Sequence, residues 1–175
     1  MKATGIVRRI DDLGRVVIPK EIRRTMRIRE GDPLEIFTGA GEVVFKKYSP
    51  VGELSEFAGQ YAEALSETCK LPIIICDRDH CIAAAGISKK QVLERRITPF
   101  LEEIMENRRT AVLDDSNLKG ALEGVDSNIS VAVPITNSGD VCGAVALINK
   151  ENTTAGETDI KLAQVAASFL GKQME

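Results

Sequence analysis

Arginine is the residue type in this chain whose number and spacing could do chemistry, and it is concentrated near the N-terminus. Between Arg8 and Arg29 the sequence holds eight Lys and Arg residues against three Asp and Glu residues. The planar guanidinium group can donate two parallel hydrogen bonds to a phosphate or to the edge of a guanine. The alternative is a solvated face of surface salt bridges, but pairing every acid would still leave this segment with a charge of +5.

The charge of the chain is divided unevenly between its two parts. The 175 residues carry a net charge of −3, yet residues 1–50 hold eleven Lys and Arg against seven Asp and Glu, whereas the remaining residues hold twelve against nineteen. Such asymmetry is typical of a nucleic-acid-binding segment joined to a body with another task. With Ser49-Pro50 as the junction, we predict two domains, residues 1–50 and residues 51–175.

Other residue types that do chemistry are sparse. His80 is the only histidine, and the four cysteines show no CxxC spacing, so a zinc site is not predicted. Three of the cysteines lie in apolar stretches, which is typical of small buried thiols. No nucleophile elbow or Ser/His/Asp order is present, and the glycines form no phosphate loop. We therefore expect no catalytic residues, no metal, no cofactor and no enzymatic activity.

The first 48 residues predict a small β-rich module. Gly5–Ile10 and Val16–Ile18 are expected to be short β segments around a turn, followed by a helix over Pro19–Arg27. Leu34–Thr38 and Val43–Tyr48 are expected to form a hairpin. A module of this size without a disulfide or metal has a marginal core. We therefore predict that it pairs with an identical chain by exchanging strands.

The body predicts an α+β fold with a mainly antiparallel sheet flanked by helices. Its expected elements are a helix over Val51–Cys69, strands over Leu71–Asp77 and Cys81–Ala85, a helical stretch over Ser88–Glu106 interrupted at Thr98-Pro99, a strand over Thr110–Leu113, a polar loop over Asp114–Ser127, a hairpin of Ile129–Ile135 with Val141–Ile148, and a last helix capped at Thr154. The last helix is expected to turn Leu162, Val165, Ala166, Phe169 and Leu170 inward. The helix over Val51–Cys69 can be plain core or a dimer seam that transmits rearrangement, and both interpretations stay open.

The N-terminal module resembles a known family. Gly14-Arg15-Val16-Val17-Ile18-Pro19-Lys20-Glu21-Ile22-Arg23-Arg24, followed by Ile28 to Ile36, is similar to the AbrB-like swapped-hairpin domain. The resemblance implies two chains that interleave their hairpins into a dimer, with DNA contacts by the arginines matching Arg8, Arg15, Arg23 and Arg24. Together with neighbouring basic residues, the predicted DNA-binding set is Arg8, Arg9, Arg15, Lys20, Arg23 and Arg24.

The body resembles a second family. Val133-Pro134-Ile135 followed by Gly139, Val141 and Gly143 to Leu147 looks like the central hairpin of a GAF domain. An AbrB-like domain joined to a GAF-like one resembles regulators of late sporulation genes, acting as activators and repressors. The resemblance places a ligand site between the sheet and the segments Ser88–Phe100 and Asp114–Ser127, so we expect the body to sense a small molecule or another protein.

These resemblances lead to one preferred function and two alternatives. We expect a cytoplasmic DNA-binding transcriptional regulator without a membrane segment, which forms a homodimer through its N-terminal domain and a tetramer through its GAF-like domain. One alternative is an AbrB-like antitoxin that binds a toxin, which the folded, patterned body disfavours. The other is an enzyme tethered to DNA, which the missing catalytic residues disfavour.

Overall fold

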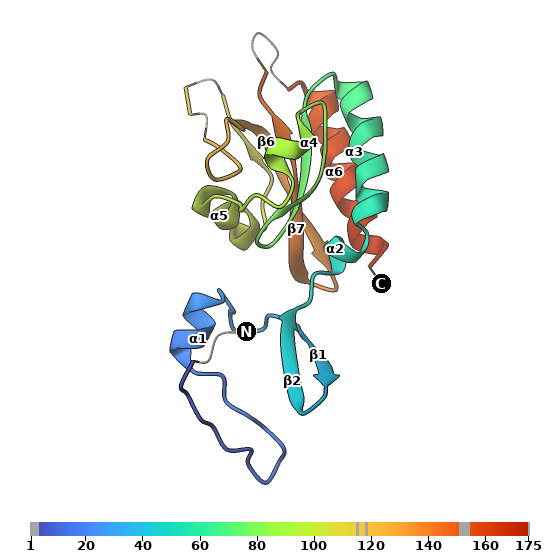
Figure 1. The fold of residues 1–175 in the computed structure, drawn as a ribbon. Helices are drawn as coiled ribbons and strands as arrows, with labels where there is room; N and C mark the ends of the chain where they lie inside the picture. The colour runs from blue at the N-terminus through green and yellow to red at the C-terminus, as the bar shows by residue number, and fades with distance from the viewer. Residues whose placement is uncertain (1–3, 115, 118, 151–154, 175) are drawn as a thin grey trace. The chain divides into compact units, whose positions relative to one another are not determined.

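A computed structural model of the chain describes residues 4–114, 116–117, 119–150 and 155–174 (Figure 1). It divides into two compact units with the boundary between Tyr48 and Ser49. The N-terminal unit is called the head below and the second unit is called the body. Each unit is described by itself.

The head contains one short helix and one β-hairpin. Helix α1 covers Lys20–Thr25 and begins directly after Pro19, whose fixed φ suits a helix start. Strands β1 (Leu34–Gly39) and β2 (Glu42–Lys47) are antiparallel and are joined by a two-residue turn. Gly41 in that turn has a φ of +79°, the left-handed region in which glycine is unstrained. The hairpin predicted from the sequence is therefore confirmed, with a shift of about one residue at its ends.

The two β segments expected before α1 are not strands in the single chain. Residues 4–19 contain no strand, and the hydrogen bonds between backbone groups within this stretch lie at the turn, where the amide of Asp11 donates to the carbonyl of Arg15 at 3.0 Å. The two arms of the loop stand apart in Figure 1. An extended segment becomes a strand only when another strand supplies hydrogen bonds, and the single head has none within reach of these arms.

The body is built on a five-stranded antiparallel sheet in the order β4-β3-β7-β6-β5. Its strands are β3 (Ile73–Asp77), β4 (Cys81–Ala85), β5 (Ala111–Val112), β6 (Ile129–Asn137) and β7 (Asp140–Ile148). The central strands are long apolar runs because both faces of the sheet are covered. The predicted α+β class with an antiparallel sheet is confirmed.

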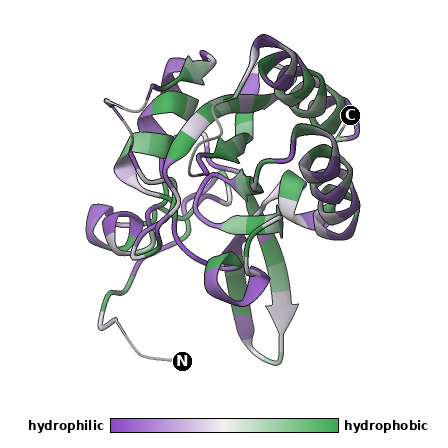
Figure 2. Cartoon of the chain, turned by 90° about the horizontal axis from the view of Figure 1, so that it is seen from above, coloured by the Kyte–Doolittle hydropathy of each residue, from purple (hydrophilic) through white to green (hydrophobic). Residues whose placement is uncertain are grey.

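Helices cover both faces of this sheet. On one face, α3 (Ser55–Cys69) and α6 (Glu157–Lys172) pack small side chains such as Ala58, Ala62 and Ala166 against the strands. On the other face lie α4 (Lys89–Val92), α5 (Pro99–Asn107) and the loop after β5, which bury Val92 and Leu101. Figure 2 shows the strands as mainly hydrophobic and the helices as mixed, as expected for elements with one buried side.

Three expectations for the helices need correction. The helix over Val51–Cys69 is split into α2 (Pro50–Glu53) and α3, because the chain bends at Leu54. The hydroxyl of Ser49 accepts a hydrogen bond from the amide of Gly52 at 3.0 Å and caps the short α2. The helical stretch over Ser88–Glu106 is interrupted before Pro99 as predicted, but its first part, α4, ends already at Val92, and bridge-forming chain leads from there to α5.

The orientation of the last helix also differs from expectation. Val165 and Phe169 are exposed, whereas Ala163 and Ala167 are buried with Ala166 and Leu170. The predicted cap, Thr154, lies outside the described residues. Instead, the carboxylate of Asp159 accepts a hydrogen bond from the amide of Gly156 at 2.8 Å. Within the described ranges, no helix is both long and apolar enough to cross a membrane.

Candidate nucleic-acid interface

The first basic segment of the head is a tight turn that holds Arg15. The carboxylate of Asp11 accepts hydrogen bonds from the amide of Leu13 at 3.0 Å, the amide of Arg15 at 2.7 Å and the guanidinium Nε of Arg15 at 2.8 Å. The bonds from Arg15 lower the pKa of Asp11 below its usual value. Gly14 completes the turn with a φ of +76°. The guanidinium is oriented through Nε while most of its surface faces solvent.

The second basic segment is α1 itself. Lys20, Arg23 and Arg24 are exposed, and none of the three makes an ion pair or side-chain hydrogen bond to another described residue. The helix ends through two backbone bonds, from the amide of Ile28 to the carbonyl of Arg23 at 2.8 Å and from the amide of Arg27 to the carbonyl of Arg24 at 3.3 Å. This C-terminal motif fixes the direction in which the last turn presents its arginines.

A partly buried ion pair ties the end of α1 to the hairpin. The side chain of Asp32 is 3% exposed and lies 3.6 Å from the ammonium group of Lys47 on β2. The same ammonium group donates a hydrogen bond to the carbonyl of Arg27 at 2.7 Å. Asp32 also accepts a hydrogen bond from the amide of Arg29 at 2.8 Å. Nothing in the spacing of Asp32 and Lys47 along the sequence shows that they meet.

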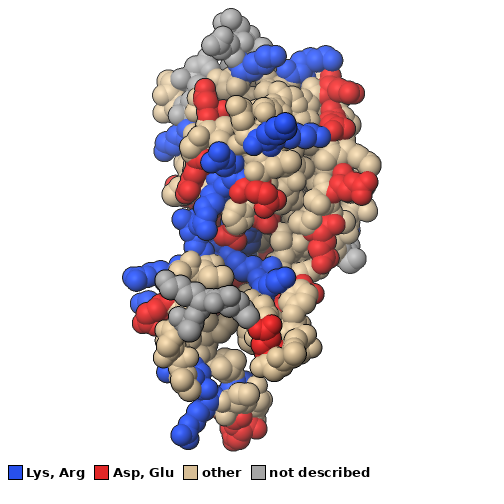
Figure 3. Space-filling model, viewed as in Figure 1, with Lys and Arg blue, Asp and Glu red and all other residues tan. Residues whose placement is uncertain are grey.

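The remaining predicted site residues, Arg8 and Arg9, lie on the arm before the turn. Both are exposed and neither makes an ion pair with a described residue. Figure 3 shows Lys and Arg side chains over both the loop and α1 of the head, with acidic groups interspersed. The six predicted residues thus fall into two groups, one around the first turn (Arg8, Arg9 and Arg15) and one on α1 (Lys20, Arg23 and Arg24).

The head does not close a hydrophobic core by itself. Among residues 4–48, Pro19 is the only one that is buried. The loop arms and the hairpin leave large apolar side chains exposed, among them Val7, Ile10, Val17, Ile36 and Phe45. Exposed apolar surface on this scale marks a surface that another chain covers.

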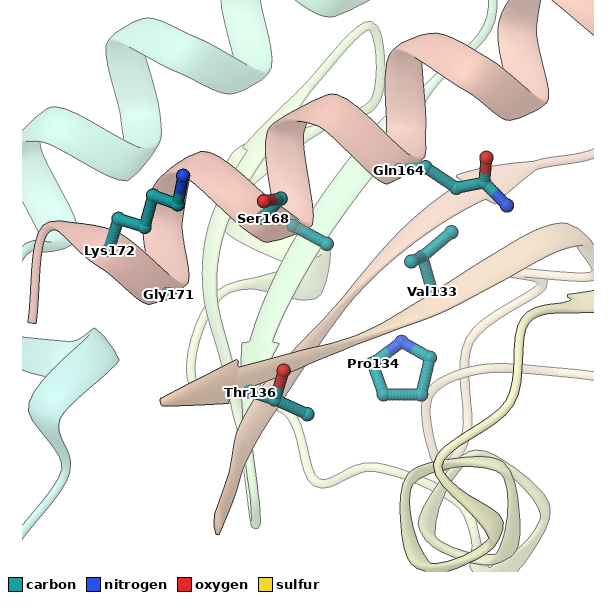
Figure 4. Close-up of a pocket in the computed structure, with 8 residues that line it drawn as sticks. Val133, Pro134, Thr136, Gln164, Ser168, Gly171 and Lys172 are labelled. Atoms are coloured by element: carbon teal, nitrogen blue, oxygen red, sulfur yellow. The ribbon is translucent and has the colours of Figure 1, made fainter. Parts of the chain in front are cut away.

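The body offers two hollows away from the segments where a ligand site was expected. One, of about 340 Å³, lies between α6 and β6 and is lined by Val133, Pro134, Thr136, Gln164, Ala167, Ser168, Gly171 and Lys172 (Figure 4). The other, of about 450 Å³, lies at the end of α3 beside Pro72 and Gly86. The segments Ser88–Phe100 and Asp114–Ser127 line neither hollow, and they bury Ile97 and Leu122 on the sheet instead.

Few other groups in the described part of the body are placed to do chemistry. In the described part of the chain, no three His, Cys, Asp or Glu side chains come together as a metal site. Cys69, Cys76 and Cys81 are buried and Cys142 is half-buried. Burial raises the pKa of Cys69 to about 11, and the neighbouring Cys81 thiol together with burial raises that of Cys76. The thiols of Cys69 and Cys76 are therefore protonated at neutral pH and poor nucleophiles, which agrees with their predicted role as core residues.

Comparison with known proteins finds a matching family for each of the two units. A family model described as "Stage V sporulation protein T C-terminal, transcription factor" matches residues 53–175, and one described as "Antidote-toxin recognition MazE, bacterial antitoxin" matches residues 7–52. Stage V sporulation protein T of Bacillus subtilis (strain 168) is 51% identical over 178 residues, which cover 100% of this chain and 99% of that relative.

Two further relatives each match one unit. The transition state regulatory protein AbrB of Bacillus subtilis (strain 168) is 52% identical over 62 residues, 32% of this chain and 65% of that protein. Among solved structures, the GAF domain of a phosphoenolpyruvate-protein phosphotransferase from Coxiella burnetii is 19% identical, with a TM-score of 0.56 over 69% of this chain and 82% of that one. At that identity the likeness shows the fold alone, and the fold of the body is that of a GAF domain.

Proposed function

The chain belongs to the family of stage V sporulation protein T transcription factors, and from this premise we propose that it regulates late sporulation genes by binding double-stranded DNA through its head. The observation that carries the proposal is the set of exposed cations on two firmly held segments, the Asp11–Arg15 turn and α1. A negatively charged ligand is the natural partner of exposed cations such as those of α1, which form no ion pair with a described residue. The protein acts as a binding protein in the cytoplasm, and the proposal includes no catalytic step.

The proposed DNA-binding residues are Arg8, Arg9, Arg15, Lys20, Arg23 and Arg24. With only six residues, α1 is too short to lie along the major groove as a recognition helix. The last turn of α1 and the loop around Asp11–Arg15 would contact the duplex, so that the end of the helix and not its side faces the DNA. Contacts dominated by arginine favour phosphates and groove shape over a long base-by-base code.

We propose that two heads interleave to complete one core. Each head supplies unpaired arms and exposed apolar side chains, and a second copy offers both the missing strands and the missing cover. The dimer would present every arginine twice. DNA with two-fold related half-sites is the matching target.

Selection of genomic DNA tests this function. The full chain should enrich promoter fragments from sheared DNA of a spore-forming bacterium. The Arg23→Ala/Arg24→Ala variant should lose the enrichment, because it removes two exposed cations from each chain. The Lys89→Ala/Lys90→Ala variant is the matched control, since it removes the same charge from a short helix of the body. Equal enrichment by all three proteins would contradict the proposal.

We further propose that the bodies pair through α3 and α6, which would join two dimers into a tetramer. Phe57, Tyr61 and Phe169 form an aromatic cluster across the two helices, with ring centroids 5.5–6.5 Å apart. Phe169 is 38% exposed and Val165 on the same side of α6 is 58% exposed. Rings that are half-buried on adjacent helices are typical of a helix-mediated interface.

Light scattering on the full chain tests this pairing. The Phe169→Glu variant should be a dimer at concentrations where the unmodified protein is a tetramer, because a carboxylate cannot be buried among rings. Leu93→Glu is the control, since Leu93 has a similar exposure of 37% but lies away from the cluster. A tetramer that survives Phe169→Glu would move the interface elsewhere.

The signal that the body senses is proposed to be a small polar molecule bound between α6 and β6. The hollow there presents the side chains of Thr136, Gln164, Ser168 and Lys172 (Figure 4). Gln164, Ser168 and Lys172 lie on the face of α6 next to Val165 and Phe169, so a ligand there could alter the proposed body interface. Native mass spectrometry of the purified full chain should show a bound small molecule, and Ser168→Phe, which fills the hollow, should abolish it. The same added mass in both proteins, or no added mass in either, would contradict the ligand proposal.

A further inference from the structure

Arg27 holds a backbone conformation that is costly for any residue except glycine. Its φ is +50°, and it follows directly on the last turn of α1. Its amide donates to the carbonyl of Arg24 and the next amide, that of Ile28, donates to the carbonyl of Arg23. Glycine is the usual residue at this point of the motif, because a Cβ is strained in the left-handed region.

Contacts within the head hold the backbone of Arg27 in this strained conformation. Its carbonyl accepts a hydrogen bond from the ammonium group of Lys47 at 2.7 Å. Lys47 is held in turn by the nearly buried carboxylate of Asp32 at 3.6 Å. Strained residues persist where their surroundings over-determine them, and such positions cluster at functional sites.

Repulsion between like charges also makes an arginine at position 27 unfavourable within the chain. Arg27 follows Arg24 by three residues and Arg23 by four, so three guanidinium groups crowd one end of a short helix. The side chain of Arg27 is exposed and makes no hydrogen bond or ion pair with any other described residue. Backbone strain and like-charge repulsion thus both oppose arginine here, and no contact within the described chain offsets them.

A competing explanation is the helix dipole, which favours a basic residue at any helix C-terminus. Lys70 after α3 and Arg108 after α5 are also basic residues at positive φ. The dipole of six-residue α1 is weaker than that of fifteen-residue α3, however, and the charged residue three positions before Lys70 is the acid Glu67. Lys70 therefore supplies the comparison in which a basic residue follows a helix without other cations crowded beside it.

We infer that Arg27 is a further DNA contact, which binds a backbone phosphate of the duplex beside Arg23 and Arg24. The inference rests on the proposed function of the head and extends its interface beyond the residues assigned from the sequence. The strained, fixed backbone presents the guanidinium in one direction, which reduces the ordering cost of the contact. Bound phosphate would also neutralise the crowded charge.

The test compares three variants of the full chain by DNA affinity at several salt concentrations. Arg27→Gly should retain or raise the melting temperature, since glycine relieves the strain, yet lower the affinity about tenfold. It should flatten the log–log salt dependence by about two units for a dimer, one lost phosphate contact per chain. Arg27→Lys should keep nearly the full salt slope, because the charge remains. Lys70→Gly removes the same charge and the same strain from the body, and it should leave DNA affinity unchanged.

Three results would overturn the inference. If Arg27→Gly binds DNA with unchanged affinity and slope while Arg23→Ala/Arg24→Ala fails to bind, Arg27 lies outside an interface that otherwise stands. If Lys70→Gly lowers the affinity as much as Arg27→Gly does, the effect is one of net charge and Arg27 makes no particular contact. If neither the Arg27 nor the Arg23/Arg24 variant changes binding, the proposed function of the head fails together with this inference.

Discussion

Gly171 marks the closest approach of α6 to the sheet, and a single methyl group there tests how the body is assembled. A Cβ at this position would lie 2.2 Å from the carbonyl oxygen and 3.3 Å from the carbonyl carbon of Thr136 on β6. Both are backbone atoms at a register shift in the sheet, so no side-chain rotation can relieve the clash. The end of α6 would have to move by about 1 Å to restore an ordinary contact.

The expected cost of Gly171→Ala follows from two opposed effects. Overpacking of a well-filled site costs about 1–3 kcal/mol. Replacing glycine by alanine in a helix returns about 0.5–1 kcal/mol, and less at Gly171, which is next to the last residue of α6. The net expectation is a loss of about 1–2 kcal/mol in the free energy of unfolding.

Urea unfolding of the full chain, followed by circular dichroism at the helix band, measures this loss. The signal reports mainly the body, because the head contributes only the six residues of α1. With a slope of about 1.5 kcal/mol per molar urea, the midpoint should fall by about 1 M. The control is Gly59→Ala in α3, where a Cβ meets no atom within 4 Å, and its midpoint should rise. Equal midpoints for the two variants would refute the claim that α6 is seated on β6 through this glycine.

Three further predictions concern the head and its junction with the body. Asp11→Ala should weaken DNA binding, although it removes a negative charge, because the turn loses the carboxylate that holds Arg15; tighter binding would show that Asp11 acts only through its charge. The pKa of Asp11 in the folded protein lies below its usual value of 3.8, so the carboxylate keeps its stabilising hydrogen bonds above pH 3.8 and loses them only as the pH falls through the lowered pKa. The loss of DNA affinity caused by Asp11→Ala should therefore be the same across about pH 5–8 in a binding titration. Ser49→Ala should lower the unfolding free energy of the body by about 1 kcal/mol in urea titrations, since the hydroxyl caps α2 and donates to Asp77 at 3.0 Å; an unchanged midpoint would assign no role to this cap.

The sequence allowed the hairpin, the antiparallel sheet and the two family resemblances to be predicted, and these are confirmed. Each of them rests on local pattern. Alternating β-branched residues beside Gly39 and Gly41 specify the hairpin, and apolar runs such as Ile73–Cys76 specify strands covered on both faces. Local pattern was sufficient because the partner of each of these segments lies in the same chain.

Expectations failed where the deciding partner is distant or absent from the chain. The arms around Asp11 have the composition of strands but find no strand to pair with in one head. Periodicity alone assigned Val165 and Phe169 to the inward face of α6, whereas alanines fill that face because the helix approaches the sheet closely. The positive φ of Arg27 leaves no trace in residue types, because arginine at that position contradicts the usual preference for glycine.

The most direct test of the account is the salt dependence of DNA binding by the full chain on an enriched promoter duplex. We expect a steep fall of affinity with salt for the unmodified protein. For Arg23→Ala/Arg24→Ala we expect a slope about 3–4 units flatter, since four phosphate contacts per dimer are lost at about 0.9 unit each. Melting temperatures should agree, because neither side chain makes a hydrogen bond or an ion pair with another described residue. Coincident slopes for two equally stable proteins would contradict the claim that α1 of the head binds the DNA backbone.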